Sequence, residues 1–481
     1  MSAPVEIDRR QFLAGLGASL GAASISCGDN RAAALAPDAG APDAAPRPPG
    51  DAAVTACTAG DDRSAAQLLA GIDTIVVLCL ENRSFDHCLG ALRLVEGRGD
   101  VDGLTGAESN PDREANPVTV HPIADFTASD PGHNWGACHK QWNHGANDGF
   151  VLAHAGAFQA DVMGYHVRAQ RPVSYALADA GVVCNRWFAS CLAPTWPNRA
   201  YLHAATSAGM QKDLPMLFLW PTIWDRLAGA GLGGVNYFHD IAWVVGGFGQ
   251  TTGLAPIEQF FTDAAAGTLP PLAVIDPAFT GDANDDHPTH DIHLAQALIA
   301  SVVAALGASP QWNRCLFVLT YDEHGGFFDH VPPPALGPLV EPDPAFGSLG
   351  FRVPAVVVGP HVRRGCAVDT VLEHCSVLST VSRRFDLAPI NPRAAAAADL
   401  SSCIDPRRLS DPLPPPVLPV VEISGQALAA RAALATHGRP ELAAALAARP
   451  AAPGLNRRDQ AHQVIRRVLE HGQRLGAVRI T

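Results

Sequence analysis

IDTIVVLCL, residues 72–80, runs directly into the polar string ENRSFDH, residues 81–87. The first string is apolar and rich in β-branched side chains, a pattern that predicts a strand buried on both faces. In an open α/β sheet, ligands bind beyond the carboxyl ends of the strands. Acidic and amide side chains at that point therefore predict a functional site at one edge of a parallel sheet.

The segments around this strand alternate between helical and strand patterns. Helices are expected at 222–227, 257–266, 293–306 (ending at Gly307), 425–447 and 457–475, and strands at 235–238, 272–275, 315–321 and 353–358. The expected fold class is therefore α/β, with a mainly parallel central sheet flanked by helices on both faces. We place this domain at 70–392, and expect 393–481 to be a helical segment packed on it or appended to it.

Two further polar clusters accompany these patterns. YDEHGGFFDH at 321–330 follows the strand at 315–321, and NDDHPTH at 284–290 precedes the helix at 293–306. Taken alone, each could be a helix cap or a solvated turn. Two acidic clusters that both abut buried strands instead predict a shared metal site, with oxygen ligands from Glu81, Asn82, Asp322 and Glu323. Such ligands suit Mg²⁺, Ca²⁺ or Mn²⁺, and carboxylates with histidine also hold Zn²⁺.

The string APTWPNR at 193–199 leads into another helical pattern. Thr195 lies where a helix N-cap is expected, with Pro197 in the first turn. A hydroxyl at that point is either a cap or a nucleophile, because the positive end of the helix favours a phosphoryl oxygen. The second alternative needs a metal or a base that lowers the pKa of the hydroxyl.

Residues 1–27 have the pattern of an export signal peptide. Arg9 and Arg10 precede an apolar run that is too short to span a bilayer. Paired arginines are typical of the twin-arginine pathway, which predicts a periplasmic, secreted or lipid-anchored protein. Cys27 stands where a lipoprotein carries its lipid, but Ser24 replaces the usual leucine, so lipidation stays open.

Composition sets the wider limits. Residues 28–69 are expected to form a disordered linker, because 28–62 contain mostly Ala, Pro, Asp and Gly. The 481 residues are 47% hydrophobic and carry a net charge of -13 without a long Lys/Arg run, which argues against a nucleic-acid surface. The 11 cysteines include no C-x-x-C pair, and their disulfide pairing cannot be deduced from sequence.

Several long strings occur in order along the chain. They are ENRSFDH at 81–87, GHNW at 132–135, APTWPNR at 193–199, YDEHGGFFDHVPPP at 321–334 and FRVPAVVVGP at 351–360. Together they resemble the successive motifs of the phosphoesterase family of bacterial phospholipases C and acid phosphatases. The resemblance implies an alkaline-phosphatase-like fold and a metal-dependent hydrolase of phosphoric esters.

The resemblance also implies roles for individual residues. The ligands of one or more divalent cations (Ca, Mg, Mn or Zn) would be Glu81, Asn82, Thr195, Asp322 and Glu323. Thr195 would also be the nucleophile that forms a phosphothreonine intermediate. Candidates for contact with phosphoryl oxygens or for protonation of the leaving group are His133, His287 and His330. Candidates for substrate binding are Asn198, Arg199 and His324. For each of the four histidines, for Asn198 and for Arg199, the alternative is a purely structural role.

The substrate class is less constrained. Phospholipase-like members of the family tend to carry Thr as the nucleophile, so Thr195 favours a phospholipase C-type diesterase acting on phosphate esters or phospholipids. Trp135, with Trp142 and Trp196, could form an aromatic box for a quaternary ammonium headgroup, or could pack in the core. A phosphomonoesterase and a catalytically silent surface lipoprotein are the alternatives. Contact with a membrane through substrate or a lipid anchor, and the oligomeric state, stay open.

Overall fold

The computed structural model describes residues 57, 62–124, 129–154, 156, 158–214, 220–250, 252–281, 283–426, 428, 457 and 460–481. The chain divides into Met1–Ala52 and Ala53–Thr481, and all described residues belong to the second unit. The expected signal peptide, Cys27 and most of the expected linker lie outside the described residues. No helix within the described ranges is both long and apolar enough to cross a membrane.

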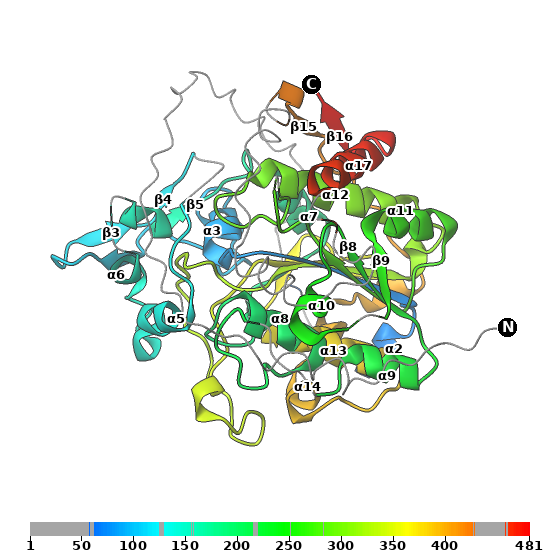
Figure 1. Cartoon of the computed structure of the whole chain (residues 1–481), viewed down its shortest axis with the longest axis horizontal. Helices are drawn as coiled ribbons and strands as arrows, with labels where there is room; N and C mark the ends of the chain where they lie inside the picture. Colours follow the sequence, from blue (N-terminus) through cyan, green and yellow to red (C-terminus); the bar gives the residue numbers. More distant parts are fainter. Residues whose placement is uncertain are drawn as a thin grey trace, which may run out of the picture. The chain divides into compact units, whose positions relative to one another are not determined.

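The described part of the chain contains an eight-stranded sheet in the order β13-β6-β12-β11-β1-β10-β8-β9 (Figure 1). Its strands are β1 (Thr74–Leu80), β6 (Val182–Cys184), β8 (Gly234–Phe238), β9 (Leu254–Pro256), β10 (Leu272–Asp276), β11 (Cys315–Tyr321), β12 (Ala355–Val358) and β13 (Cys366–Val368). β12 is antiparallel to both of its neighbours, and the other pairs are parallel. The predicted α/β class with a mainly parallel sheet is confirmed.

Helices cover both faces of the sheet (Figure 1). On one side lie α7 (Pro172–Ala180), α11 (Ile257–Ala266), α12 (Ile292–Ala308) and α17 (Ala461–Arg474), and on the other α2 (Ala65–Leu69), α8 (Thr195–Ala204), α9 (Ile223–Gly229) and α13 (His374–Arg384). α17 packs on α12, and α13 packs on α8 and α2. The C-terminal segment therefore packs on the sheet domain within the described residues.

The described structure also contains smaller α-helices and short strand pairs. The helices are α3 (Phe85–Leu89), α4 (Ala91–Leu94), α5 (Trp135–Trp142), α6 (Phe150–Ala153), α10 (Trp243–Phe248) and α14 (Pro392–Ala396). The short strands pair as β2 (Ser109–Pro111) with β3 (Pro117–Thr119), β4 (His121–Pro122) with β5 (Gly164–Tyr165), β7 (Trp187–Phe188) with β14 (Leu372–Glu373), and β15 (Val421–Ile423) with β16 (Val478–Ile480).

Most predicted elements have the expected type, with bounds that move by a few residues. The helix predicted at 257–266 and the strand predicted at 315–321 match α11 and β11. α12 continues past Gly307, so the predicted stop there is wrong. A side chain at Gly307 would approach Pro415 to 2.8 Å, which gives this glycine a packing role instead. The helical pattern at 425–447 lies largely outside the described residues.

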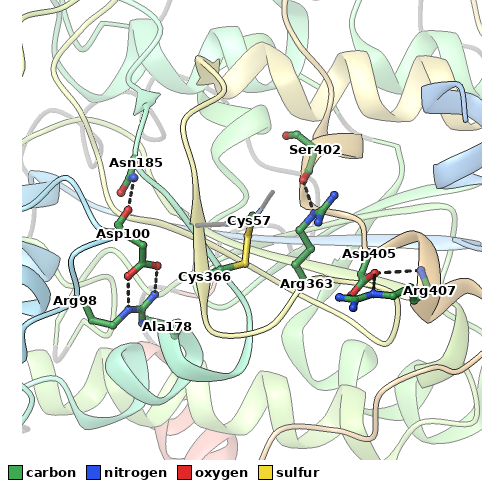
Figure 2. Close-up of a disulfide and its surroundings, with 10 residues drawn as sticks. All are labelled: Cys57, Arg98, Asp100, Ala178, Asn185, Arg363, Cys366, Ser402, Asp405 and Arg407. Atoms are coloured by element: carbon green, nitrogen blue, oxygen red, sulfur yellow. Dashed lines mark hydrogen bonds and ion pairs between the residues drawn. A yellow bond between two sulfur atoms is a disulfide. The ribbon is translucent and has the colours of Figure 1, made fainter. Parts of the chain in front are cut away.

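Ordered structure begins before residue 70. Ser64 caps α2, since its Oγ accepts the N–H of Gln67 and its own N–H donates to the Gln67 side chain. Upstream, Cys57 forms a disulfide with Cys366 on the edge strand β13 (Figure 2). The backbone N–H of Cys57 also donates to Ala367 O at 3.3 Å. The final part of the stretch expected as a linker is therefore attached to the sheet domain.

Candidate active site

The pairing of β1 with β11 brings the first two polar clusters together. The strands are parallel, with Leu80 opposite Tyr321, so the residues that follow them leave the sheet at the same edge. The backbone N–H of Asn82 donates to Asp322 Oδ1 at 3.0 Å, and the N–H of Asp322 donates to Leu80 O at 3.1 Å. Glu81, Asn82, Asp322 and Glu323 therefore form one buried cluster, as the sequence predicted.

The loop at 284–290 lies against the same edge. The N–H of Glu81 donates to Asp285 O at 2.8 Å. The Asp285 carboxylate accepts the N–H of His287 at 3.0 Å and lies 2.6 Å from His290 Nδ1. The third polar cluster of the sequence thus belongs to the same site and holds His287 beside it.

Thr195 approaches the cluster from α8. It is the first residue of the helix, and Pro194 is the N-cap, without a side-chain cap. The prediction of Thr195 as the N-cap is wrong, because its hydroxyl donates to Asn82 Oδ1 at 3.3 Å instead of capping α8. Asn198 fixes the turn that precedes the helix, since its Nδ2 donates to Ala193 O at 2.8 Å and to Pro194 O at 3.1 Å. The conformation of this turn therefore places the Thr195 hydroxyl at the cluster.

Arg199 lies fully buried within the cluster. Its guanidinium is 3.2 Å from Glu81 Oε1, 3.4 Å from Asp276 Oδ1 and 3.5 Å from Asp322 Oδ2. These contacts show Arg199 positioning the carboxylates. Its predicted contact with a phosphoryl group stays a prediction.

Glu323 has one carboxylate oxygen that accepts hydrogen bonds in the described structure and one that does not. Its Oε2 accepts the N–H of Gly325 at 2.8 Å and lies 3.0 Å from His324 Nδ1. Its Oε1 has no hydrogen-bond partner within the described residues, although the side chain is only 1% exposed. Burial would raise the pKa of Glu323, but the nearby His133 and His324 lower it overall, so the group is ionised. A buried, ionised oxygen without a donor has the chemistry of a cation ligand.

His133 lies next to this carboxylate, and His287 lies beside His133. The ring centroids are 5.7 Å apart. His133 Nε2 is 3.2 Å from Asn82 Nδ2 and 4.0 Å from Glu323 Oε1. Burial opposes a proton on His133, but Glu323 and Asp130 outweigh it and raise its pKa. Two of the three predicted catalytic histidines therefore meet at the cluster.

The third, His330, has different partners. Its Nδ1 lies 2.7 Å from Asp86 Oδ2, and its Nε2 lies 3.3 Å from Asp102 Oδ1. Arg352 joins the same group, 3.0 Å from Asp86 Oδ1. These contacts make His330 part of a separate buried ion-pair network, and its predicted catalytic role stays a prediction.

The candidates for substrate binding also have structural contacts. His324 Nε2 lies 2.8 Å from Gln141 Oε1, on the side of the ring away from Glu323. Trp135 is half-buried, and its ring centroid lies 4.4 Å from that of His139 and 5.0 Å from that of Phe346. Within the described residues, the rings of His324 and Trp135 therefore have contacts with other side chains of the protein, and their predicted contact with substrate stays a prediction.

Sequence reasoning missed two acidic residues of the site. Asp276 is the last residue of β10, and its position at the carboxyl end of a predicted strand could have identified it. Asp213 lies between α8 and α9, and its Oδ1 accepts the N–H of Trp196 at 2.7 Å. Nothing in the sequence marks Asp213, because the conformation of a connecting loop places it there.

The sequence of this chain is similar to those of known proteins. Residues 72–388 match the Phosphoesterase family. Non-specific phospholipase C1 of Arabidopsis thaliana is 36% identical over 362 residues, which cover 66% of this chain and 67% of that protein. Phospholipase C B of Mycobacterium tuberculosis is 29% identical over 407 residues, which cover 69% of this chain and 78% of that protein.

Solved structures are more distant. The lipoteichoic acid synthase LtaP from Listeria monocytogenes aligns with a TM-score of 0.37 at 9% identity, over 72% of this chain and 80% of that chain. The phosphonate monoester hydrolase of Agrobacterium radiobacter aligns with a TM-score of 0.33 at 13% identity, over 66% and 74%. The sequence matches are the stronger result, and they show that this chain belongs to the Phosphoesterase family and is a hydrolase of phosphoric ester bonds.

Proposed function

We propose that the chain is a divalent cation-dependent phosphodiesterase of the phospholipase C type, with Thr195 as its nucleophile. The observation that carries this proposal is the Thr195 hydroxyl, which is directed at Asn82 Oδ1 at 3.3 Å, inside a cluster of buried carboxylates. The names of the relatives, which are phospholipases C, support a phospholipid or similar diester as the substrate.

The residues of the cluster fit a divalent cation. Their side chains offer carboxylate and amide oxygens, which Ca²⁺, Mg²⁺ and Mn²⁺ prefer, and Zn²⁺ also accepts carboxylates. The Oε1 atom of Glu323 is buried without a hydrogen-bond donor in the described structure. The ligands would be Glu81, Asn82, Thr195, Asp322 and Glu323.

The chemistry follows from the placement of the side chains. A divalent cation, when bound, would offset the cluster's charge and favour the alkoxide form of Thr195. Thr195 Oγ1 then forms a bond to phosphorus in line with the ester oxygen that leaves, and His133 or His287 gives that oxygen a proton. The histidine next takes a proton from water, whose oxygen displaces Thr195 from phosphorus. The products are an alcohol and a phosphoric monoester.

Export is part of the same proposal. The twin arginines at 9–10 favour passage through the twin-arginine pathway. The disulfide between Cys57 and Cys366 supports an oxidising compartment, because such bonds persist outside the reducing cytosol (Figure 2). Replacing Arg9 and Arg10 by Lys should leave the protein in the cytosolic fraction, and unchanged export would contradict this part.

The first experiment compares hydrolysis of p-nitrophenyl phosphorylcholine and p-nitrophenyl phosphate by the protein loaded with a divalent cation. Faster cleavage of the diester, lost in Thr195→Ala and largely kept in Thr195→Ser, supports the proposal. Faster cleavage of the monoester would make the protein a phosphatase instead. Thr195→Ala with near wild-type turnover would remove Thr195 from the mechanism.

A further inference from the structure

Cys184 and Cys403 come from distant parts of the chain and meet near one edge of the central sheet. Cys184 ends β6, and Cys403 ends the short 3-10 helix η5 (Leu400–Cys403). Both side chains are fully buried, and the two thiols are hydrogen-bonded to each other. Their chain neighbours Asn185 and Ser402 both lie around the existing disulfide in Figure 2. Thiols that hydrogen-bond face each other, and a disulfide needs side chains that do so.

The backbone around these two cysteines holds them in place. β6 lies between β12 and the edge strand β13, with Cys184 opposite Val368. The backbone N–H of Arg363 donates to Cys403 O at 2.9 Å, and its side-chain Nε donates to Ser402 O at 3.2 Å (Figure 2). Because Arg363 lies in the segment that leads into β13, η5 is held against the strand that runs beside Cys184.

The existing disulfide lies on the same face of the sheet. Cys366 on β13 pairs with Val182, which is two residues before Cys184 on β6. Side chains two residues apart on a strand point to one face, and paired residues of neighbouring strands share that face. The Cys366 and Cys184 side chains therefore lie on one face. Cys57 links the N-terminal part of the chain to this face, and Cys403 brings the C-terminal segment to it.

We propose that Cys184 and Cys403 form a second disulfide when the protein meets a disulfide oxidant such as oxidised glutathione. The two thiols lose two electrons and two protons and form an S–S bond, while the disulfide of the oxidant is reduced to two thiols. The new bond ties η5, and with it the C-terminal segment, to the central sheet. It extends the proposed export, since disulfides persist in oxidising compartments, and it does not depend on which ester Thr195 attacks.

Burial controls the rate of this reaction. The hydrogen bond to Cys403, together with burial, raises the pKa of Cys184. The thiolate is the form that attacks a disulfide, so the closed pair reacts slowly and needs brief local opening of η5. The same burial protects the finished bond from reductants. Cys57 is only half-buried, so the disulfide between Cys57 and Cys366 should be reduced first.

Peptide mapping tests the proposal directly. The full chain is incubated with oxidised glutathione in urea below its unfolding transition, which permits local opening. Remaining thiols are then blocked with N-ethylmaleimide, and the digested protein is analysed by mass spectrometry without reduction. We expect peptides joined through Cys184 and Cys403, beside those joined through Cys57 and Cys366. Blocked or glutathione-bound Cys184 and Cys403 in most chains would overturn the proposal, whether or not the first disulfide has formed.

Thermal unfolding gives an independent readout. Cys403→Ser should lower the Tm of the oxidised protein by about 5 °C more than that of the reduced protein, because closing a long loop restricts the unfolded chain. Reduction also breaks the bond between Cys57 and Cys366, but it does so in both proteins, so that contribution cancels. Cys315→Ser, at a buried position on β11, is the matched control and should shift the Tm equally in both states. An equal shift for Cys403→Ser would overturn the proposal.

Discussion

Two buried clusters of charged residues lie at the ends of the central strands, and they differ in how completely their carboxylates are paired with cationic side chains. We call Glu81, Asp322, Glu323 and Arg199 the open cluster, and Asp86, Asp329, His330 and Arg352 the closed cluster. In the closed cluster, Arg352 lies 2.8 Å from Asp329 Oδ1 and 3.0 Å from Asp86 Oδ1, and His330 lies 2.7 Å from Asp86 Oδ2. In the open cluster, Arg199 forms ion pairs with several carboxylates, and Glu323 Oε1 has no hydrogen-bond donor in the described structure.

In the closed cluster, acidic residues near a histidine are paired with groups of the protein itself. The string FDH occurs at 85–87 and again at 328–330, and the two copies bind each other. The N–H of Asp86 donates to Asp329 Oδ2 at 3.3 Å, and the N–H of His330 donates to Asp86 Oδ2 at 2.8 Å. The closed cluster joins the two loops that carry the open cluster, and it therefore holds in place the residues for which we propose a role in catalysis.

Removing the guanidinium of the closed cluster should have the largest effect. Arg352→Met leaves Asp86 and Asp329 buried without their main cation, which costs about 3–5 kcal/mol. Urea unfolding measures the loss of free energy. The matched control is Arg168→Met, whose half-exposed guanidinium also pairs with two carboxylates, Glu96 and Asp179, and should cost about 1 kcal/mol or less. Equal losses would contradict the distinction between buried and surface pairs.

Removing one charge from the open cluster should act mainly on turnover. Glu323→Gln should lower kcat by at least ~100-fold, because it removes a proposed cation ligand. Asp329→Asn, in the closed cluster, should change kcat by less than ~10-fold when both proteins are assayed well below their unfolding temperature. Comparable losses of kcat in the two variants would contradict the distinction between a catalytic role for the open cluster and a structural role for the closed cluster.

Glu323→Gln should also differ from the wild type in stability when a chelator is present. Without a cation, Glu323→Gln removes a carboxylate whose pKa is lowered, despite burial, by His133 and His324, so its free energy of unfolding should fall by about 1–2 kcal/mol. Added cation should then raise the Tm of the wild type more than that of the variant. A variant that is more stable than the wild type in chelator would show that the neighbouring groups do not compensate the burial of the Glu323 charge.

The smallest expected effect is a pH dependence in the closed cluster. Burial lowers the pKa of His330, but Asp86 and Asp102 raise it to about 10, above its ordinary value of 6.5. The stabilisation from its charge is therefore full below pH 6.5 and is lost as the pH rises through about 10. The advantage of the wild type over His330→Gln in urea unfolding should shrink by on the order of 1–2 kcal/mol between pH 7 and pH 9. A constant advantage would mean that His330 is neutral in the folded protein.

The sequence predicts the open cluster well because of the strands that carry it. The apolar runs of β1 and β11 end abruptly at Leu80 and Tyr321, and the next residues are acidic or amide. Parallel strands in one sheet end at the same edge, so these residues had to meet if the strands were neighbours. The alternation of patterns predicts the sheet in the same way.

Other features depend on geometry that a sequence does not display. Thr195 differs from an N-cap by one position, and the backbone of Pro194 decides which residue caps α8. The balance of the closed cluster depends on Arg352, whose side chain approaches His330 only in the folded chain. Asp213 enters the site through a connecting loop, and no periodic pattern predicts where such a loop lies.

The pairing of β1 with β11 has a consequence for the order of events as the protein is made. Leu80 and Tyr321 face each other across strands from distant parts of the chain, and pairing over such separations forms late in folding. The proposed cation ligands in the open cluster do not meet until synthesis has passed Glu323 and both strands lie in register. A slip by one residue would turn the side chains of one strand to the opposite face. The proposed cation would therefore bind only after β1 and β11 have paired in the correct register.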